Sequence, residues 1–166
     1  MGFILELARA RQRIQELETQ IAPPIPQVPR FVMSAYEVTK ELDALGIIML
    51  YRRLDSTYVY TDAAGWIEVI SYIYTYMPMP EYFVKADGTW NVDCENFGIW
   101  FMDMVALKFG INYCGLAFGN KGVGEHGWNL LRDKVGVKLF EPQPAYDINH
   151  PFNQDENGYH AREVLL

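Results

Sequence analysis

The sequence has few cysteines, no cluster of basic residues and no long apolar run. Two cysteines among 166 residues exclude a disulfide-rich secreted scaffold and a zinc site built from several thiolates. Fourteen Lys and Arg residues against 21 Asp and Glu residues give a net charge of −7, which disfavours binding to nucleic acid. No segment approaches the roughly 20 apolar residues that span a bilayer. We therefore expect neither a nucleic-acid nor a membrane partner.

The first residues, MGFILELARARQ, also lack the features of a targeting signal. No basic residue precedes the apolar ones, and Glu6 and Arg9 interrupt the run that a signal peptide requires. Position 6 is not the Ser or Thr that myristoylation of Gly2 would require. We expect a protein made in the cytoplasm with both of its thiols reduced.

The sequence is rich in apolar residues, which make up half of it, and 14% of its residues are aromatic. This composition predicts one compact domain with an appendage. Residues 1–22 form the appendage, because apolar residues recur there at spacings of three and four and would line one stripe of a helix: Phe3, Leu7, Ala10, Ile14, Leu17 and Ile21. An isolated helix of this length is marginal in water. Residues 2–22 are therefore expected to dock on their own domain, on a partner helix or on further copies of the chain.

The rest of the chain divides into a spacer and a domain. Residues 23–30 contain four prolines, which cannot continue a helix and predict a stiff, extended spacer. Residues 31–166 form the domain, with helices expected over 34–46, 62–77 and 94–110. Strands are expected over 112–119, 126–132 and 137–143, joined by short turns as an antiparallel meander. Helices followed by a meander indicate an α+β fold, with the polar tail from residue 142 wrapping the surface.

Three residues form a candidate catalytic set. Cys94 is expected at the first turn of a helix, where the helix dipole and a nearby imidazolium would lower the pKa of its thiol. His126 begins a strand and Glu141 ends the next one, so a hairpin would bring them close together. The sequence therefore predicts a nucleophile, a general base and acid, and a carboxylate that orients the imidazole. The alternative is a buried cysteine and a core histidine without catalytic roles.

An oxyanion hole would complete such a site. The backbone N–H of Cys94 is one expected donor, and Asn91 or Trp90 would supply the second. The sequence does not choose between these two. The other cysteine, Cys114, lies among apolar residues of a predicted strand and is expected in the core.

The motifs DCENF, GEHGWNLL and VKLFEPQ resemble those of the C-terminal protease domain of the Marasmius oreades agglutinin family. The segment LDSTYVYTDAAGWIEVI resembles that family more weakly, so the likeness spans residues 50–145. It implies a papain-like fold with Cys94, His126 and Glu141 as the catalytic triad. Glu125 and Gly127 depart from the family, which has glycine before the histidine and alanine after it. No sugar-binding lectin repeat is present.

The resemblance also bears on cofactors and setting. The agglutinin domain resembles a calcium-activated protease, which makes Asp93 and Glu95 candidate calcium ligands, although first-turn carboxylates also stabilise a helix dipole. Stand-alone relatives of the domain resemble proteins of bacteria and their phages, so incorporation into a virion is one setting that the resemblance implies.

Three functional hypotheses follow. The first is a cysteine hydrolase that cleaves a peptide or isopeptide amide. The second is a structural component of a larger assembly, such as a phage particle, tethered by residues 2–22 and carrying a silent triad. The third is an amidase acting on peptidoglycan stem peptides, which shares the nucleophile of the first and differs in its substrate.

Overall fold

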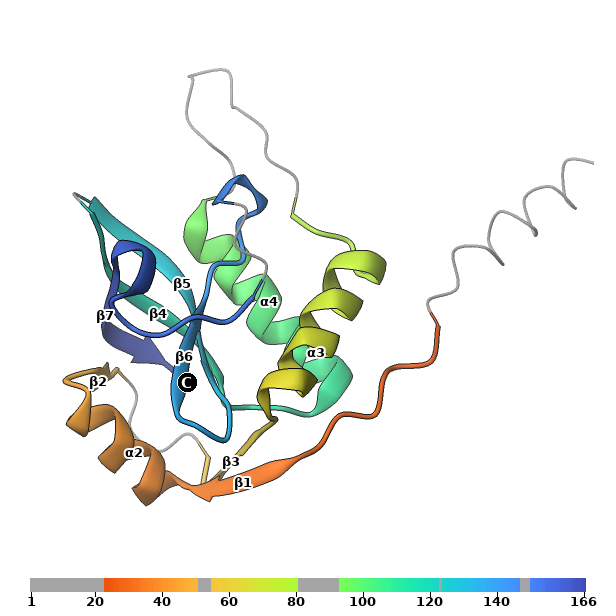
Figure 1. The fold of residues 1–166 in the computed structure, drawn as a ribbon, viewed down its shortest axis with the longest axis horizontal. Helices are drawn as coiled ribbons and strands as arrows, with labels where there is room; N and C mark the ends of the chain where they lie inside the picture. The colour runs from red at the N-terminus through yellow and green to blue at the C-terminus, as the bar shows by residue number, and fades with distance from the viewer. Residues whose placement is uncertain (1–22, 51–54, 81–92, 123, 147–149) are drawn as a thin grey trace, which may run out of the picture.

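The computed structural model describes residues 23–50, 55–80, 93–122, 124–146 and 150–166 (Figure 1). The predicted helix over residues 1–22 lies outside this part of the chain, so its existence and its partner stay predictions. The described part contains helices and mostly antiparallel strands, which confirms the α+β prediction. In chain order its elements are β1 (Phe31–Ser34), α2 (Ala35–Ala44), β2 (Ile48–Met49), β3 (Thr57–Tyr60), α3 (Ala63–Tyr76), α4 (Cys94–Phe109), β4 (Cys114–Lys121), β5 (Gly124–Arg132), β6 (Val137–Phe140) and β7 (Tyr159–Leu165), with short 3-10 turns at Pro144–Tyr146 and Glu156–Gly158.

The helix boundaries follow from capping residues that are visible in the sequence. Ser34 and Glu37 form the expected capping box at the start of α2. Asp62 accepts a hydrogen bond from the Gly65 N–H at 3.0 Å and begins α3. Asp93 precedes α4, which ends at Gly110 in the left-handed conformation, with φ of 61°. The N-terminus of α4, which carries Cys94, is therefore fixed by local chemistry.

The main sheet contains five strands in the order β2-β7-β4-β5-β6, and β1 pairs with β3 in a separate two-stranded sheet. Strands β4, β5 and β6 form the predicted antiparallel meander. The prediction of a surface-wrapping tail is wrong for β7, which lies between β2 and β4 with Tyr159 and Val164 fully buried. In its first half, buried Tyr159 and Ala161 alternate with exposed His160 and Arg162, so this strand buries one face while its average composition is polar.

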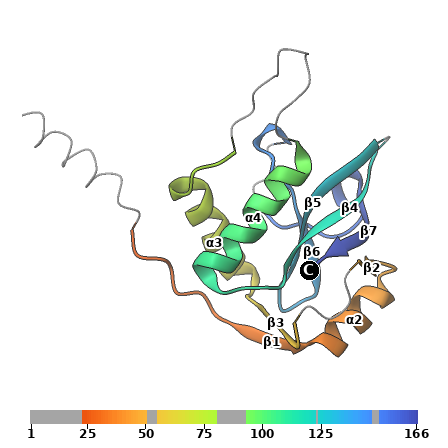
Figure 2. The same cartoon turned by 180° about the vertical axis from the view of Figure 1, so that it is seen from behind.

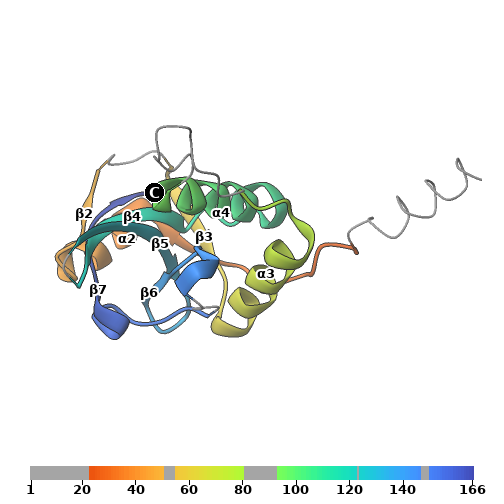
Figure 3. The same cartoon turned by 90° about the horizontal axis from the view of Figure 1, so that it is seen from above.

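Helices α3 and α4 lie side by side, and α4 packs against β4 and β5 (Figures 1, 2 and 3). Gly98 permits this approach, because a Cβ there would meet the Leu116 side chain at 2.4 Å. The buried Asn129 side chain donates to the carbonyls of Gly98, at 2.9 Å, and Gly115, at 3.2 Å. One side chain thus ties α4 to the sheet and fixes the position of Cys94 relative to β5.

The proline-rich segment over 23–30 is extended, as predicted, but it is not a free spacer. The hydroxyl of Tyr72 on α3 donates to the Pro23 carbonyl at 3.1 Å, and Val28 packs against the core between α3 and α4. The segment from Pro23 to Arg30 is therefore attached to the domain at both of these points. Among the described helices, none has the length and apolar character needed to cross a bilayer.

Candidate active site

The imidazole of His126 and the carboxylate of Glu141 are in contact. The His126 Nε2 atom lies 2.7 Å from Glu141 Oε2, and the two side chains are only 10% and 0% exposed. The β5–β6 register pairs Asn129 with Phe140, so one further step places Glu141 opposite Trp128 and diagonal to His126. Diagonal neighbours on one face of a sheet are within reach of long side chains. The sequence thus predicted the contact, although the two residues are diagonal rather than directly opposite.

Glu141 is held in place by three donors. Its Oε2 atom also accepts the Tyr159 hydroxyl at 2.8 Å, and its Oε1 atom accepts the Gln143 N–H at 2.9 Å. A buried carboxylate requires such donors, because an unpaired charge in the interior is costly. Tyr159 was not among the predicted site residues, since nothing in the tail indicated that its strand enters the sheet beside β4. A single tyrosine within a run of alternating apolar residues was the only available signal.

Cys94 is the first residue of α4, and its half-buried thiol lies at the edge of β5. The Sγ atom accepts the Gly127 N–H at 3.4 Å. Gly127 precedes Asn129, which is the first residue of β5 that pairs with β6. A Cβ at position 127 would lie 3.6 Å from Sγ, an ordinary contact, so the family's alanine would fit here. The structure therefore places the thiol against the residue that follows His126.

This arrangement favours the protonated form of the thiol. The pKa of Cys94 is raised to about 11, first by burial and then by Glu95, whose Oε2 atom accepts the thiol hydrogen at 3.1 Å. The Gly127 N–H opposes this shift by favouring the thiolate. The sequence predicted a lowered pKa from the helix N-terminus and an imidazolium. It did not foresee that the next residue along the helix would turn its carboxylate back onto the thiol.

Of the two candidate calcium ligands, Glu95 has a partner for its carboxylate, whereas the contact of Asp93 is made by its backbone N–H. The Cys94 thiol lowers the pKa of Glu95 by donating to its carboxylate, and the Asp93 N–H donates to Asn96 Oδ1 at 3.1 Å at the helix start. In the described part of the chain, no three His, Cys, Asp or Glu side chains gather as metal ligands would. Calcium binding through Asp93 and Glu95 stays a prediction.

Aromatic side chains border the histidine. The ring of Tyr146 meets His126 edge to face at 5.2 Å, and Lys121 Nζ lies 2.9 Å from the centre of the Tyr146 ring. Burial raises the pKa of the Tyr146 hydroxyl, and the nearby negative charge of Glu141 raises it further. Tyr146 is itself 41% exposed, so it lies between His126 and the solvent.

The remaining candidates are placed as follows. Asn91 and Trp90, the proposed oxyanion donors, lie outside the described residues. Cys114 is buried, as predicted for a core residue. Glu125, one of the departures from the family, forms an ion pair with Arg162 on β7 at 2.5 Å. Its carboxylate is thus directed to a surface contact between strands.

No family model matches this sequence, and no curated protein sequence matches it. Solved structures do resemble it. The structure described as "PSL1a-E64 complex" superposes with a TM-score of 0.57 at 21% identity, covering 81% of this chain and 50% of that one. The Polyporus squamosus lectin bound to the epitope Neu5Aca2-6Galb1-4GlcNAc superposes with a TM-score of 0.48 at 21% identity, covering 73% of this chain and 48% of that one.

These similarities concern the fold. At 21% identity, the PSL1a structure shows that this chain adopts a backbone arrangement found in a larger protein of the Polyporus squamosus lectin type. The chain spans about half the length of each of these proteins. What the whole of such a protein binds does not transfer with the fold.

Proposed function

We propose that this protein is a papain-like cysteine hydrolase related to the agglutinin protease domain, which cleaves a peptide or isopeptide amide. The observation that carries the proposal is the 2.7 Å contact between His126 Nε2 and the buried Glu141 carboxylate, next to a thiol held at a helix N-terminus. A carboxylate bound to one ring nitrogen selects the tautomer whose other nitrogen accepts a proton.

The reaction follows from these groups. As Sγ of Cys94 attacks the carbonyl carbon, its proton passes to His126 Nδ1, because a protonated thiol is a weak nucleophile. The C–N bond breaks and the leaving amine takes that proton, which leaves a thioester. Water then adds to the thioester, the acid departs and the thiol is restored. Glu141 stabilises the imidazolium that forms in each half of the reaction.

The fold similarity supplies one probe for this proposal, because the similar PSL1a structure is described as a complex with E64. The peptide and isopeptide substrates follow from the resemblance of the DCENF, GEHGWNLL and VKLFEPQ motifs. Peptidoglycan stem peptides are amides of the same class and belong among the substrates to be assayed.

Carbohydrate binding is a second candidate, favoured by the fold shared with part of a lectin. Calorimetric titration with sialyl-N-acetyllactosamine tests it directly. Saturable binding would support this candidate, and the absence of saturable binding would count against this sugar as the ligand. The assembly hypothesis, with a silent triad, predicts neither sugar binding nor hydrolysis.

In the decisive experiment, the protein is incubated with a mixture of unfolded peptides, and new C-termini are identified by mass spectrometry. We expect cleavage by the wild type, none by Cys94→Ala, and a loss of at least about 100-fold in His126→Ala. His160→Ala is the matched control, because His160 also contacts a carboxylate, Asp155, but is 54% exposed. Its activity should equal that of the wild type.

Two results would overturn the proposal. Cleavage that persists in Cys94→Ala would come from a contaminant or from another residue. The absence of cleavage, together with alkylation of Cys94 that is indifferent to His126→Ala, would mean that the three residues are structural.

A further inference from the structure

Lys121 lies on the same face of the main sheet as the histidine of the candidate triad. It ends β4 and pairs with Tyr159 of β7, and Gly119, two residues earlier on β4, pairs with His126 of β5. Residues that are directly opposite on neighbouring strands share a face, as do residues two apart on one strand. The side chains of Lys121, His126 and Tyr159 therefore point to one side of the sheet.

The ammonium group of Lys121 is held against two aromatic rings. Its Nζ atom lies 2.9 Å from the centre of the Tyr146 ring and 4.8 Å from the centre of the Tyr159 ring, and the face of such a ring attracts a cation. The Tyr146 ring in turn meets the His126 ring edge to face, with 5.2 Å between the ring centres. One aromatic ring thus separates the ammonium from the imidazole.

In the part of the chain that the structure describes, Lys121 forms no ion pair. Other cations of this part are paired with carboxylates: Arg132 with Glu41, Lys134 with Asp62 and Arg162 with Glu125. Partial burial lowers the pKa of Lys121, which indicates that its ammonium has lost part of its water. A partly dehydrated cation binds an anion more strongly than a cation in bulk water does.

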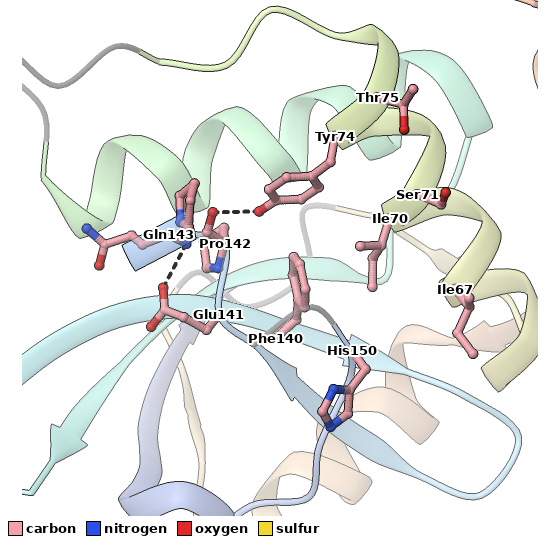
Figure 4. A pocket seen from close by; sticks show the side chains of 11 residues that line it. Ile67, Ile70, Ser71, Tyr74, Thr75, Phe140, Glu141, Pro142, Gln143 and His150 are labelled. Carbon is pink, nitrogen blue, oxygen red and sulfur yellow. Dashed lines mark hydrogen bonds between the residues drawn. The ribbon is translucent and has the colours of Figure 1, made fainter. Parts of the chain in front are cut away.

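Glu141 attracts this ammonium but is occupied by other donors. Its Oε1 atom accepts the Gln143 N–H (Figure 4), and its Oε2 atom binds His126 and the Tyr159 hydroxyl. On its other side, the segment after β6 forms a pocket of about 600 Å³ with α3 (Figure 4), and Lys121 does not line that pocket. The ammonium is therefore left for a group from outside the described part of the chain.

We propose that Lys121 binds a carboxylate of the peptide substrate close to the bond that is cleaved. This inference rests on the proposed hydrolase function and adds to it a preference for acidic substrates. The carboxylate belongs either to an acidic side chain or to the C-terminus of the peptide, since an ammonium is a point charge that binds both. An extended peptide advances about 3.5 Å per residue, and only the Tyr146 ring lies between the ammonium and His126. The carboxylate is therefore expected one or two residues from the cleaved bond.

The test uses short peptides of Ala and Leu that carry a neutral fluorophore. One series is amidated at its C-terminus and has Glu or Gln at each position in turn, and a second series has a free or an amidated C-terminus. We expect Glu at one position, or the free C-terminus, to raise kcat/KM about 10-fold, the effect of one hydrogen bond between charged groups. Lys121→Gln should reduce that preference at least about 5-fold, and Lys121→Arg should retain most of it. The series that shows the preference identifies the source of the carboxylate.

Lys134→Gln is the matched control, because Lys134 Nζ also lies over an aromatic ring, that of Phe31 at 4.3 Å, but pairs with Asp62. It should leave the preference unchanged. Anisotropy measurements of the same peptides on Cys94→Ala separate binding from hydrolysis. Preferential binding of the carboxylate peptide that Lys121→Gln abolishes in this background would support the inference even if no peptide were cleaved.

Two results would overturn the role of Lys121. One is equal binding and equal kcat/KM for Glu and Gln at every position and for the free and amidated C-termini. The other is a preference for the carboxylate that persists in Lys121→Gln. Cleavage by the wild type without such a preference would overturn this inference and leave the proposed hydrolase function in place.

Discussion

Tyr159 and His126 bind the same oxygen atom, Oε2 of Glu141, at 2.8 and 2.7 Å. They reach it from strands that are separated by β4 in the sheet. The hydroxyl is buried, and burial raises the pKa of Tyr159, as does the hydrogen bond to Glu141. The tyrosine therefore stays a hydrogen-bond donor throughout the working pH range and fixes the carboxylate that orients the histidine.

This contact predicts that Tyr159→Phe lowers kcat about 10-fold without changing KM, the effect of losing one hydrogen bond to a charged group. The ring itself would remain, packed against Trp128 and Phe152. The measurement is a double-mutant cycle with Glu141→Gln. If the tyrosine acts through the carboxylate, Tyr159→Phe should have no further effect in the Glu141→Gln background. Equal losses in both backgrounds would instead mean that the hydroxyl supports only the fold.

The contact between Glu95 and the Cys94 thiol predicts that the thiol is alkylated slowly and that one substitution raises the rate of alkylation. Because the pKa of Cys94 is about 11, the alkylation rate should rise about tenfold per pH unit from pH 7 to pH 10, since the thiolate reacts. Glu95→Gln removes the carboxylate that stabilises the protonated thiol. The pKa should fall and iodoacetamide alkylation at pH 8 should rise about 3- to 10-fold.

Glu125→Gln is the control for that experiment, because it removes the same charge from a residue that pairs with Arg162. The alkylation rate should not change in this variant. Equal pH profiles for wild type and Glu95→Gln would contradict the role given to the Glu95 carboxylate.

The insertion of β7 beside β4 predicts a strong effect of a single methyl group at Gly119. A Cβ there would lie 2.0 Å from the backbone oxygen of His160, so the two strands would have to separate. Gly119→Ala should lose about 3 kcal/mol or more of unfolding free energy, measured in urea. Gly127→Ala, whose nearest contact would be 3.5 Å, should stay within about 0.5 kcal/mol of the wild type. Similar midpoints for both variants would show that β7 does not occupy this place.

The apolar stripe over residues 2–22 predicts association in solution. A chain that begins at Pro23 keeps the Tyr72 contact to the Pro23 carbonyl but loses the stripe. We expect light scattering to give a larger mass per particle for the full chain than for this truncated one, after correction for length. Leu7→Glu with Ile14→Glu should act like the truncation, whereas Arg13→Glu on another face should not. Equal particle masses would leave docking on the chain's own domain as the role of the stripe.

Local chemistry in the sequence determined the helix starts at Ser34, Asp62 and Asp93 and the end of α4 at Gly110, because capping depends on neighbours within three or four residues. It also determined the β4–β5–β6 meander and, through the short hairpin, the approach of His126 to Glu141. These features involve partners that are close along the chain, so the sequence pattern predicts them.

The tertiary structure alone decided where β7 enters the sheet, and with it the bond from Tyr159 to Glu141. A strand that pairs with a distant partner carries no mark of that partner in its own residues, and its alternating pattern fits an exposed tail as well as a sheet. The raised pKa of Cys94 likewise comes from burial and from the rotamer of Glu95. The pocket beside Glu141 arises where α3 meets the segment after β6, about 70 residues further along the chain, a distance over which spacing and composition predict nothing.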